Sequence, residues 1–182
     1  MSCTLTLGRK EPCKDTVGGL KAVYFTDFGD YGTVTETDDE ITDLTGTFTA
    51  FKYELKGNSS FEQAITSSRE NGTTFFDQTL TLTLKKLSKE TNKELKLLAY
   101  GRPHVAVEDY NGNVFVMGLQ HGAEVTGGTV STGAAMADLS GYTLTLNAQE
   151  TKPANFVNAP TAADPFAGMA SATVTVTEGT NS

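Results

Sequence analysis

The sequence predicts a mainly β fold, with two packed antiparallel sheets in the manner of a β-sandwich or open barrel and one flanking α-helix. Threonine and leucine alternate strictly over Thr79–Leu84, and this two-residue period is typical of a half-buried strand. Directly upstream, Asn71-Gly72 is the pair that favours a tight hairpin turn, because both residues tolerate positive φ. About seven or eight strand-like segments and one helical segment occupy the 182 residues, which predicts a single domain.

The central unit is predicted to be a long hairpin followed by a short helix. Phe61–Arg69 should pair with Thr73–Leu84 through the Asn71-Gly72 turn. Ser88 is expected to cap the helix, Gly101 to end it in a left-handed conformation, and Pro103 to prevent its continuation. The apolar residues fall near one helical face: Leu87, Leu95, Leu98 and Ala99.

Further strands are expected on both sides of this unit, and Arg9–Gly19 is expected to be a connection because it contains proline and paired glycines. A second hairpin should turn at Asn111-Gly112. The final strand should lie at a sheet edge. The strand segments are Cys3–Leu7, Leu20–Phe28, Thr47–Lys56, His104–Asp109, Val114–Gly118, Ser140–Ala148 and Ala172–Thr177.

Three segments show little periodic alternation of apolar and polar residues. Gly29–Thr45 is acidic and threonine-rich, and it is either a solvated loop or an extended arm (about 29–45) that folds against a neighbouring subunit. Gly122–Ala137 is expected to be a mobile loop or one ordered by a partner, and the C-terminal part, about 153–182, should be loosely structured before and after its edge strand. The candidate residues of the assembly arm are Asp30, Tyr31, Asp38, Asp39, Glu40 and Asp43.

The composition excludes several classes of protein. The chain has 14 Lys+Arg against 22 Asp+Glu, a formal net charge of −8, which argues against wrapping nucleic acid but permits a surface along which it slides. Cys3 and Cys13 form no disulfide framework and no metal-binding spacing. The N-terminal stretch is unlike a signal peptide, and no apolar run is long enough to span a membrane, so a soluble protein without membrane association is expected.

Tests for catalytic and metal-binding motifs are negative. Asp27-Phe28-Gly29 matches a kinase tripeptide without the glycine-rich and catalytic loops that a kinase needs. Asp109–Asn113 lacks the spacing of a calcium loop and is interpreted as a hairpin turn. His104 and His121 lie at strand ends, where hydrogen bonding is a better interpretation than metal binding. We therefore expect no cofactor, no metal and no catalytic residues.

Five motifs together resemble a family of structural proteins of tailed bacteriophages and prophages, the tail tube proteins. The resemblance covers about Phe48 to Phe156. It is carried by Phe61-Glu62-Gln63-Ala64-Ile65, Arg69-Glu70-Asn71-Gly72-Thr73-Thr74-Phe75-Phe76, Leu97-Leu98-Ala99-Tyr100-Gly101-Arg102-Pro103, His121-Gly122-Ala123-Glu124-Val125-Thr126-Gly127-Gly128 and Ser140-Gly141-Tyr142-Thr143-Leu144-Thr145-Leu146.

The resemblance implies two packed antiparallel sheets with a flanking helix, hexameric rings that stack into a tube, and a lumen through which DNA passes without specific binding. It implies as partners other copies of the chain and other tail proteins, and as location the virion tail, assembled in the bacterial cytoplasm. It also implies that the early connection between strands contacts the adjacent ring. Three alternatives remain open: a ring or hub protein, a tube terminator, or a β-sandwich binding module of the particle, which would present clustered exposed aromatic residues on a concave face.

Overall fold

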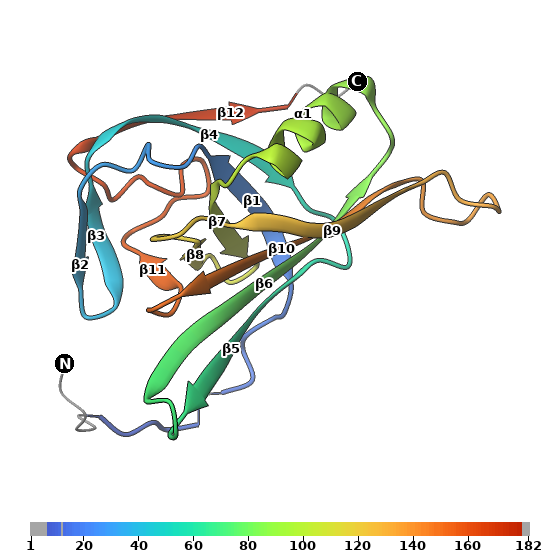
Figure 1. Cartoon of the computed structure of the whole chain (residues 1–182). Helices are drawn as coiled ribbons and strands as arrows, with labels where there is room; N and C mark the ends of the chain where they lie inside the picture. Colours follow the sequence, from blue (N-terminus) through green and yellow to red (C-terminus); the bar gives the residue numbers. More distant parts are fainter. Residues whose placement is uncertain (1–6, 12, 180–182) are drawn as a thin grey trace.

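The computed structural model describes residues 7–11 and 13–179. The predicted fold class is confirmed, because two packed sheets and one helix make up the molecule (Figure 1). The larger sheet has eight strands in the order β12-β4-β1-β7-β8-β11-β3-β2, and the smaller has four in the order β5-β6-β10-β9. The elements are β1 (Leu20–Thr26), β2 (Val34–Thr37), β3 (Glu40–Leu44), β4 (Gly46–Glu54), β5 (Ser60–Ser68), β6 (Thr73–Lys85), α1 (Lys89–Tyr100), β7 (His104–Asp109), β8 (Val114–Met117), β9 (Glu124–Ser131), β10 (Gly141–Glu150), β11 (Asn155–Val157) and β12 (Ala172–Glu178).

The predicted hairpin and helix are confirmed. Strands β5 and β6 pair antiparallel, and Gly72 has a φ of 63° in the turn between them. The hydroxyl of Ser88 accepts a hydrogen bond of 3.0 Å from the Thr91 amide and so caps α1. The left-handed cap at Gly101 was wrong: Gly101 has φ −90° and ψ 177°, because the chain leaves the helix in an extended conformation toward β7.

Two apolar clusters lie on the two faces of the eight-stranded sheet. In β1, Val23 and Phe25 point into the cluster between the sheets, whereas Ala22 and Tyr24 point into a second cluster on the opposite face. Because β1 is covered on both faces, it has a continuous apolar run from Ala22 to Phe25. The inter-sheet cluster also contains Leu80, Leu82, Val105, Val107 and Leu146, and the second cluster contains Ile41, Leu44, Phe48, Val116, Phe166 and Met169.

The segment Gly29–Thr45 is not the unpatterned loop or extended arm that we expected. It forms the hairpin β2–β3 at the edge of the eight-stranded sheet, with Asp38 and Asp39 at φ 52° and 62° in the turn. Ile41 and Leu44 are fully buried in the second cluster. Burial of these two side chains and the parallel pairing of β3 with β11 explain why the segment forms regular structure.

Two other expectations of irregular structure are corrected in part. Within Gly122–Ala137, residues 124–131 form β9 and pair with β10, and only the stretch from Thr132 onward is an exposed loop. The backbones of β9 and β10 approach closely at Gly128. A Cβ at this position would lie 2.8 Å from the Thr143 carbonyl oxygen, so the position requires glycine. Within Pro153–Ala170, Phe166 and Met169 are buried and so belong to the second cluster.

The sheets differ from the prediction in two further respects. The eight-stranded sheet is mixed and not purely antiparallel, because β12 pairs parallel with β4 and β11 pairs parallel with β3. Twelve strands occur in residues 7–11 and 13–179, in place of the expected seven or eight. The predicted edge position of the last strand is confirmed. Cys3–Leu7 lies outside the described residues except for Leu7, which is exposed and in no strand.

Candidate assembly surface

The solvent face of the four-stranded sheet is lined mainly by hydroxyl groups. The pairing register places Thr81 between Ser60 and Thr145. The next row has the same character, with Thr83 beside Thr143 and Thr143 beside Thr129. We call this surface the hydroxyl face; its members are Ser60, Glu62, Ala64, Thr66, Ser68, Thr73, Phe75, Asp77, Thr79, Thr81, Thr83, Lys85, Glu124, Thr129, Thr143, Thr145, Asn147 and Gln149. All of these residues are exposed or half-buried.

The hydroxyl face contains hydrogen bonds between neighbouring side chains and carries little positive charge. The side-chain amide of Asn147 donates to Asp77 Oδ1 at 2.5 Å and to Thr79 Oγ1 at 3.3 Å. Its charged members are Glu62, Asp77, Glu124 and Lys85, so carboxylates outnumber lysines. Such a face presents hydroxyl dipoles and lacks the clustered lysines and arginines that bind phosphates.

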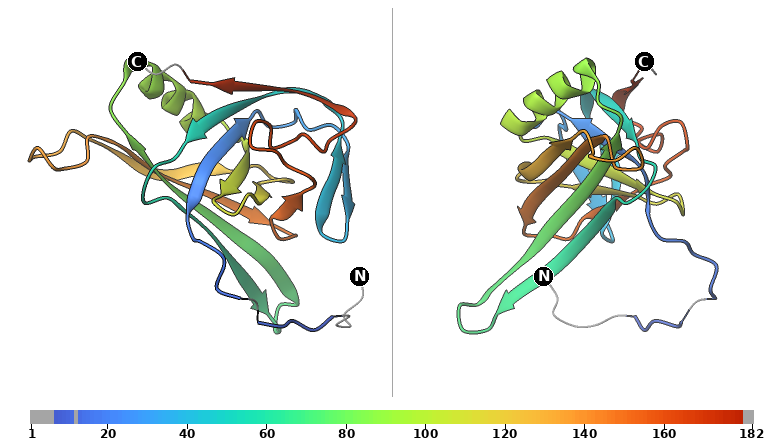
Figure 2. Two further views of the ribbon diagram at one scale, coloured as in Figure 1. Left: turned by 180° about the vertical axis from the view of Figure 1, so that it is seen from behind. Right: turned by 90° about the vertical axis from the view of Figure 1, so that its right-hand side faces the viewer.

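The four-stranded sheet is open at both edges. Strands β5 and β9 each pair with one neighbour, and they leave unpaired backbone groups over nine and eight residues. The β5–β6 hairpin extends beyond the sandwich in both views of Figure 2, and the end of β9 and β10 does so in the left-hand view. The apolar side chains of Ile65 and Val130 are 68% and 64% exposed at these edges. Long open edges with exposed apolar side chains favour pairing with another chain.

The structure brings together only some of the predicted arm residues. Asp38 and Asp39 form the exposed turn of the β2–β3 hairpin, and Glu40 follows them at the start of β3. Together they border an open hollow of about 480 Å³, whose lining also includes Val114, Phe156, Val157 and Pro160. We call Asp38, Asp39 and Glu40 the acidic turn.

Three arm candidates lie elsewhere. Tyr31 is a core residue, 6% exposed, and its ring stacks on His104 with centroids 4.4 Å apart. Burial raises the pKa of the Tyr31 phenol. Asp43 accepts hydrogen bonds from the hydroxyl and amide of Ser171 at 2.6 and 3.0 Å, which lower the pKa of its carboxyl and tie β3 to the start of β12. Asp30 is exposed. It directly precedes Tyr31 and is separated in the sequence from the acidic turn.

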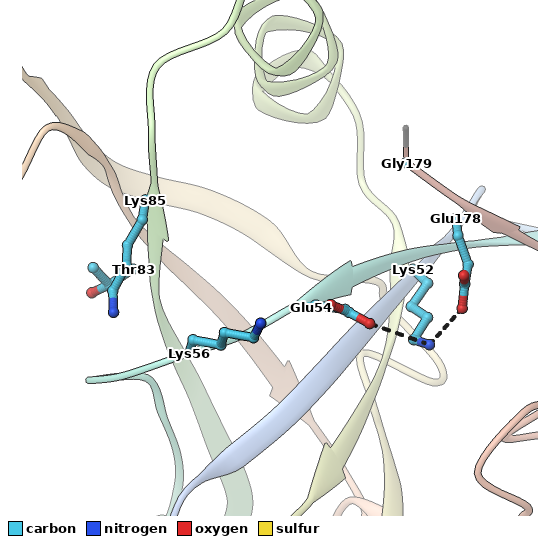
Figure 3. Close-up of a pocket in the computed structure, with 7 residues that line it drawn as sticks. All are labelled: Lys52, Glu54, Lys56, Thr83, Lys85, Glu178 and Gly179. Atoms are coloured by element: carbon cyan, nitrogen blue, oxygen red, sulfur yellow. Dashed lines mark hydrogen bonds and ion pairs between the residues drawn. The ribbon is translucent and has the colours of Figure 1, made fainter. Parts of the chain in front are cut away.

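A groove lined by lysines lies where β4, the end of β6 and the end of β12 meet (Figure 3). Lys52 donates to Glu178 at 2.6 Å, and this bond raises the pKa of the Lys52 ammonium; Glu54 lies 3.9 Å from the same ammonium. Lys56 and Lys85 have no carboxylate partner within the part of the chain that the structure describes. The groove, here called the lysine groove, encloses about 360 Å³ and is lined by Lys52, Glu54, Lys56, Thr83, Lys85, Glu178 and Gly179.

The two histidines engage separate hydrogen-bond partners. His104 Nδ1 lies 2.8 Å from the Gly118 carbonyl oxygen and Nε2 accepts from the Gly29 amide at 3.2 Å, so the ring is neutral with its proton on Nδ1. Burial lowers the pKa of His104. His121 Nδ1 lies 3.1 Å from Glu150 Oε2. The expected hydrogen bonding at strand ends is confirmed for His104, and residues 7–11 and 13–179 contain no cluster of His, Cys, Asp and Glu suited to a metal.

The interpretation of Asp109–Asn113 as a hairpin turn is also confirmed. Gly112 has a φ of 84° between β7 and β8, and the Asp109 carboxylate accepts from the amides of Asn111 and Asn113 at 2.9 and 2.8 Å. Burial opposes ionisation of Asp109, but the hydrogen bonds from Asn113 and Asn111 prevail and lower its pKa. The Asp109 oxygens are therefore occupied by the turn itself.

Comparisons with family models, curated proteins and solved structures found no match. Among the described residues, no helix has both the length and the apolar character required to cross a membrane. The fold class that the structure defines is a two-sheet β protein whose open four-stranded sheet has a hydroxyl-lined face.

Proposed function

We propose that this protein is a non-enzymatic structural subunit of a bacteriophage tail tube, and that copies close side by side into a ring through the open edges of the four-stranded sheet. The observation that carries the proposal is the pair of open edges, β5 and β9, each with an exposed apolar side chain. Pairing of β5 in one copy with β9 in the next supplies partners for unpaired backbone groups of both edges and covers Ile65 and Val130.

The two edges allow a closed ring. The two edges are different surfaces of one subunit, so their pairing is head-to-tail and needs a rotational symmetry to close. The resemblance to tail tube proteins predicts six subunits in the ring. A ring closed in this way has a continuous barrel of β5-β6-β10-β9 units as its wall.

The hydroxyl face is the surface that we assign to the lumen. Its excess of carboxylates over lysines, repeated in each subunit of a ring, produces a weakly negative wall that repels DNA phosphates. The threonine and asparagine side chains keep the wall hydrated. DNA then moves along the wall without binding it, which is what a conduit in the virion tail requires.

The experiment is sedimentation velocity of the purified protein over a wide concentration range, combined with electron microscopy. The proposal predicts a species with the mass of a ring, and stacked rings at higher concentration. Single rings that never stack favour the alternative of a hub or a terminator protein. A sharp monomer boundary at all concentrations contradicts a self-assembling tube subunit.

A further inference from the structure

Two Asn-Gly dipeptides occur in this chain, and both lie in hairpin turns. Asn71-Gly72 lies between β5 and β6, and Asn111-Gly112 lies between β7 and β8. An asparagine that is followed by glycine can react with its own backbone, because glycine has no side chain to keep its amide nitrogen away from the asparagine carboxamide. Whether the reaction occurs in a folded protein depends on what holds these two groups in place.

The structure restrains both reacting groups of Asn111-Gly112. The Asn111 side-chain amide donates to the Val17 carbonyl oxygen at 2.8 Å and to Asp109 Oδ2 at 3.3 Å, and its Oδ1 accepts from the Val17 amide at 3.0 Å. The Gly112 amide, which carries the attacking nitrogen, donates to the Asp109 carbonyl oxygen at 3.3 Å. The Asn111 carboxamide cannot turn toward Gly112 unless hydrogen bonds break.

The same dipeptide is unrestrained in the β5–β6 turn. The backbone amide of Asn71 donates to Ser68 Oγ at 3.3 Å, but within residues 7–11 and 13–179 neither the Asn71 side chain nor the Gly72 amide has a hydrogen-bond partner. A Cβ built on Gly72 would meet nothing within 4 Å, and the hairpin extends beyond the sandwich (Figure 2). The Asn71 carboxamide is therefore free to rotate onto the Gly72 nitrogen. Asn71 and Asn111 are both exposed, so hydrogen bonding and not exposure distinguishes the two sites.

We propose that Asn71 is a site of spontaneous deamidation and that the turn around Asn111 protects that residue. The Gly72 nitrogen loses its proton to hydroxide and attacks Asn71 Cγ. The Cγ–Nδ2 bond breaks, and ammonia leaves after it takes a proton from water, which restores the hydroxide and leaves a succinimide ring. Water then opens the ring. Opening at the side-chain carbonyl gives aspartate, and opening at the main-chain carbonyl gives isoaspartate, in which the chain runs through the former side chain.

The modification changes the turn and leaves the core intact. Either product adds a carboxylate next to Glu70, and isoaspartate also adds a methylene to the backbone between the paired residues Ser68 and Thr73. Asn71 and Gly72 belong to neither apolar cluster, so the modified subunit stays folded. The chemistry needs only the folded subunit and goes beyond the proposed function, whose failure would leave this inference untouched.

The test is incubation of the purified full chain at neutral and at mildly alkaline pH, followed by peptide mapping with mass spectrometry. Replacement of an amide NH₂ by OH raises the mass of the affected peptide, and chromatography separates its aspartate and isoaspartate forms. The matched control within the chain is Asn111-Gly112, and the same incubation in concentrated urea removes the folded structure around both sites. The variant Asn71→Gln verifies the assignment; Asn71 is not among the residues with positive φ, so glutamine fits its backbone.

We expect Asn71 to convert about tenfold faster than Asn111 in the folded protein, because the hydrogen bonds of Asn111 must break before it reacts. Conversion of Asn71 should speed up at higher pH, since the attacking nitrogen must lose its proton, and Asn71→Gln should abolish the mass increase in that peptide. In urea the two sites should convert at similar rates. Equal rates at the two sites in the folded protein, a faster Asn111, or an Asn71 that stays unmodified while the unfolded chain reacts would each overturn the inference. A difference that persists in urea would also overturn it, because the folded turns would then not be its cause.

Discussion

Replacing Ile65 or Val130 with lysine distinguishes the effect of these side chains on the stability of the subunit from their effect on assembly. Ile65 is 68% exposed and Val130 is 64% exposed, so roughly a third of each side chain is buried in the subunit. Full burial of such a side chain is worth about 1.5–3 kcal/mol, and the loss in the subunit is therefore about 0.5–1 kcal/mol. For a domain of this size, 1 kcal/mol lowers the melting temperature by about 2–4 °C.

The effect on assembly is expected to be much larger than the effect on folding. At a paired edge the lysine enters an apolar contact without a counter-charge, and lysine on an edge strand is a common means of preventing strand pairing. Ile65→Lys and Val130→Lys should therefore remain folded monomers. Leu97→Lys is the control, because Leu97 is 57% exposed but lies on α1 and in neither edge strand.

The assays are thermal melting by circular dichroism and sedimentation velocity at matched concentrations. We expect small shifts in melting temperature in all three variants, and loss of the ring species only in Ile65→Lys and Val130→Lys. Normal rings in either edge variant would refute the assignment of β5 and β9 as the interface. A large loss of stability in either variant would show that these side chains are core residues of the subunit.

Three further predictions concern the subunit. Gly72→Val should lower the free energy of unfolding by about 1–2 kcal/mol, because Gly72 has a φ of 63° in the β5–β6 turn; an unchanged denaturation midpoint would contradict this. Burial lowers the folded-state pKa of His104 below its ordinary 6.5, so the unfolded chain takes up the proton first and stability should fall as pH drops below about 6.5. His104→Gln should flatten the melting temperature between pH 7 and 5, and a profile equal to the wild type would exclude His104 as the cause. His104→Gln and His121→Gln should leave metal content at background in elemental analysis, whereas stoichiometric zinc that either change removes would reveal a metal site.

Local signals in the sequence were sufficient for the hairpin β5–β6, helix α1 and strand β10. The alternation over Thr79–Leu84 and over Tyr142–Leu146 matches the observed burial, because each of these strands has one face in the inter-sheet cluster. Asn71-Gly72 and Asn111-Gly112 were correctly identified as turns for the same local reason. Each signal depends only on neighbours along the chain.

Strand β3 was missed because its alternation is interrupted. Its two buried side chains, Ile41 and Leu44, are three residues apart, and the pairing with β2 shifts register between Thr35 and Glu36. An irregularity of this kind breaks the two-residue period that reveals a strand. Shortening Gly32–Asp43 would remove β2 and the buried Ile41, so this segment belongs to the fold of the subunit.

The lysine groove and the open edges could not be predicted from local pattern. Lys52, Lys85 and Glu178 come from three elements that are distant in the sequence, and only the packing of the sheets brings them together. Strand β9 has few apolar residues, and its glycines resemble a loop until the pairing with β10 is known. Its position at an edge is a property of the strand order and not of its own residues.

End-on electron micrographs of the purified wild-type protein test the central claim most directly. The account predicts closed rings of six subunits, following the resemblance to tail tube proteins, with the four-stranded sheets forming the wall of a central channel. The hydroxyl face, with Thr81 at its middle, should line that channel. Monodisperse particles of a single subunit at all concentrations, or rings whose channel is lined by the eight-stranded sheet, would contradict the account.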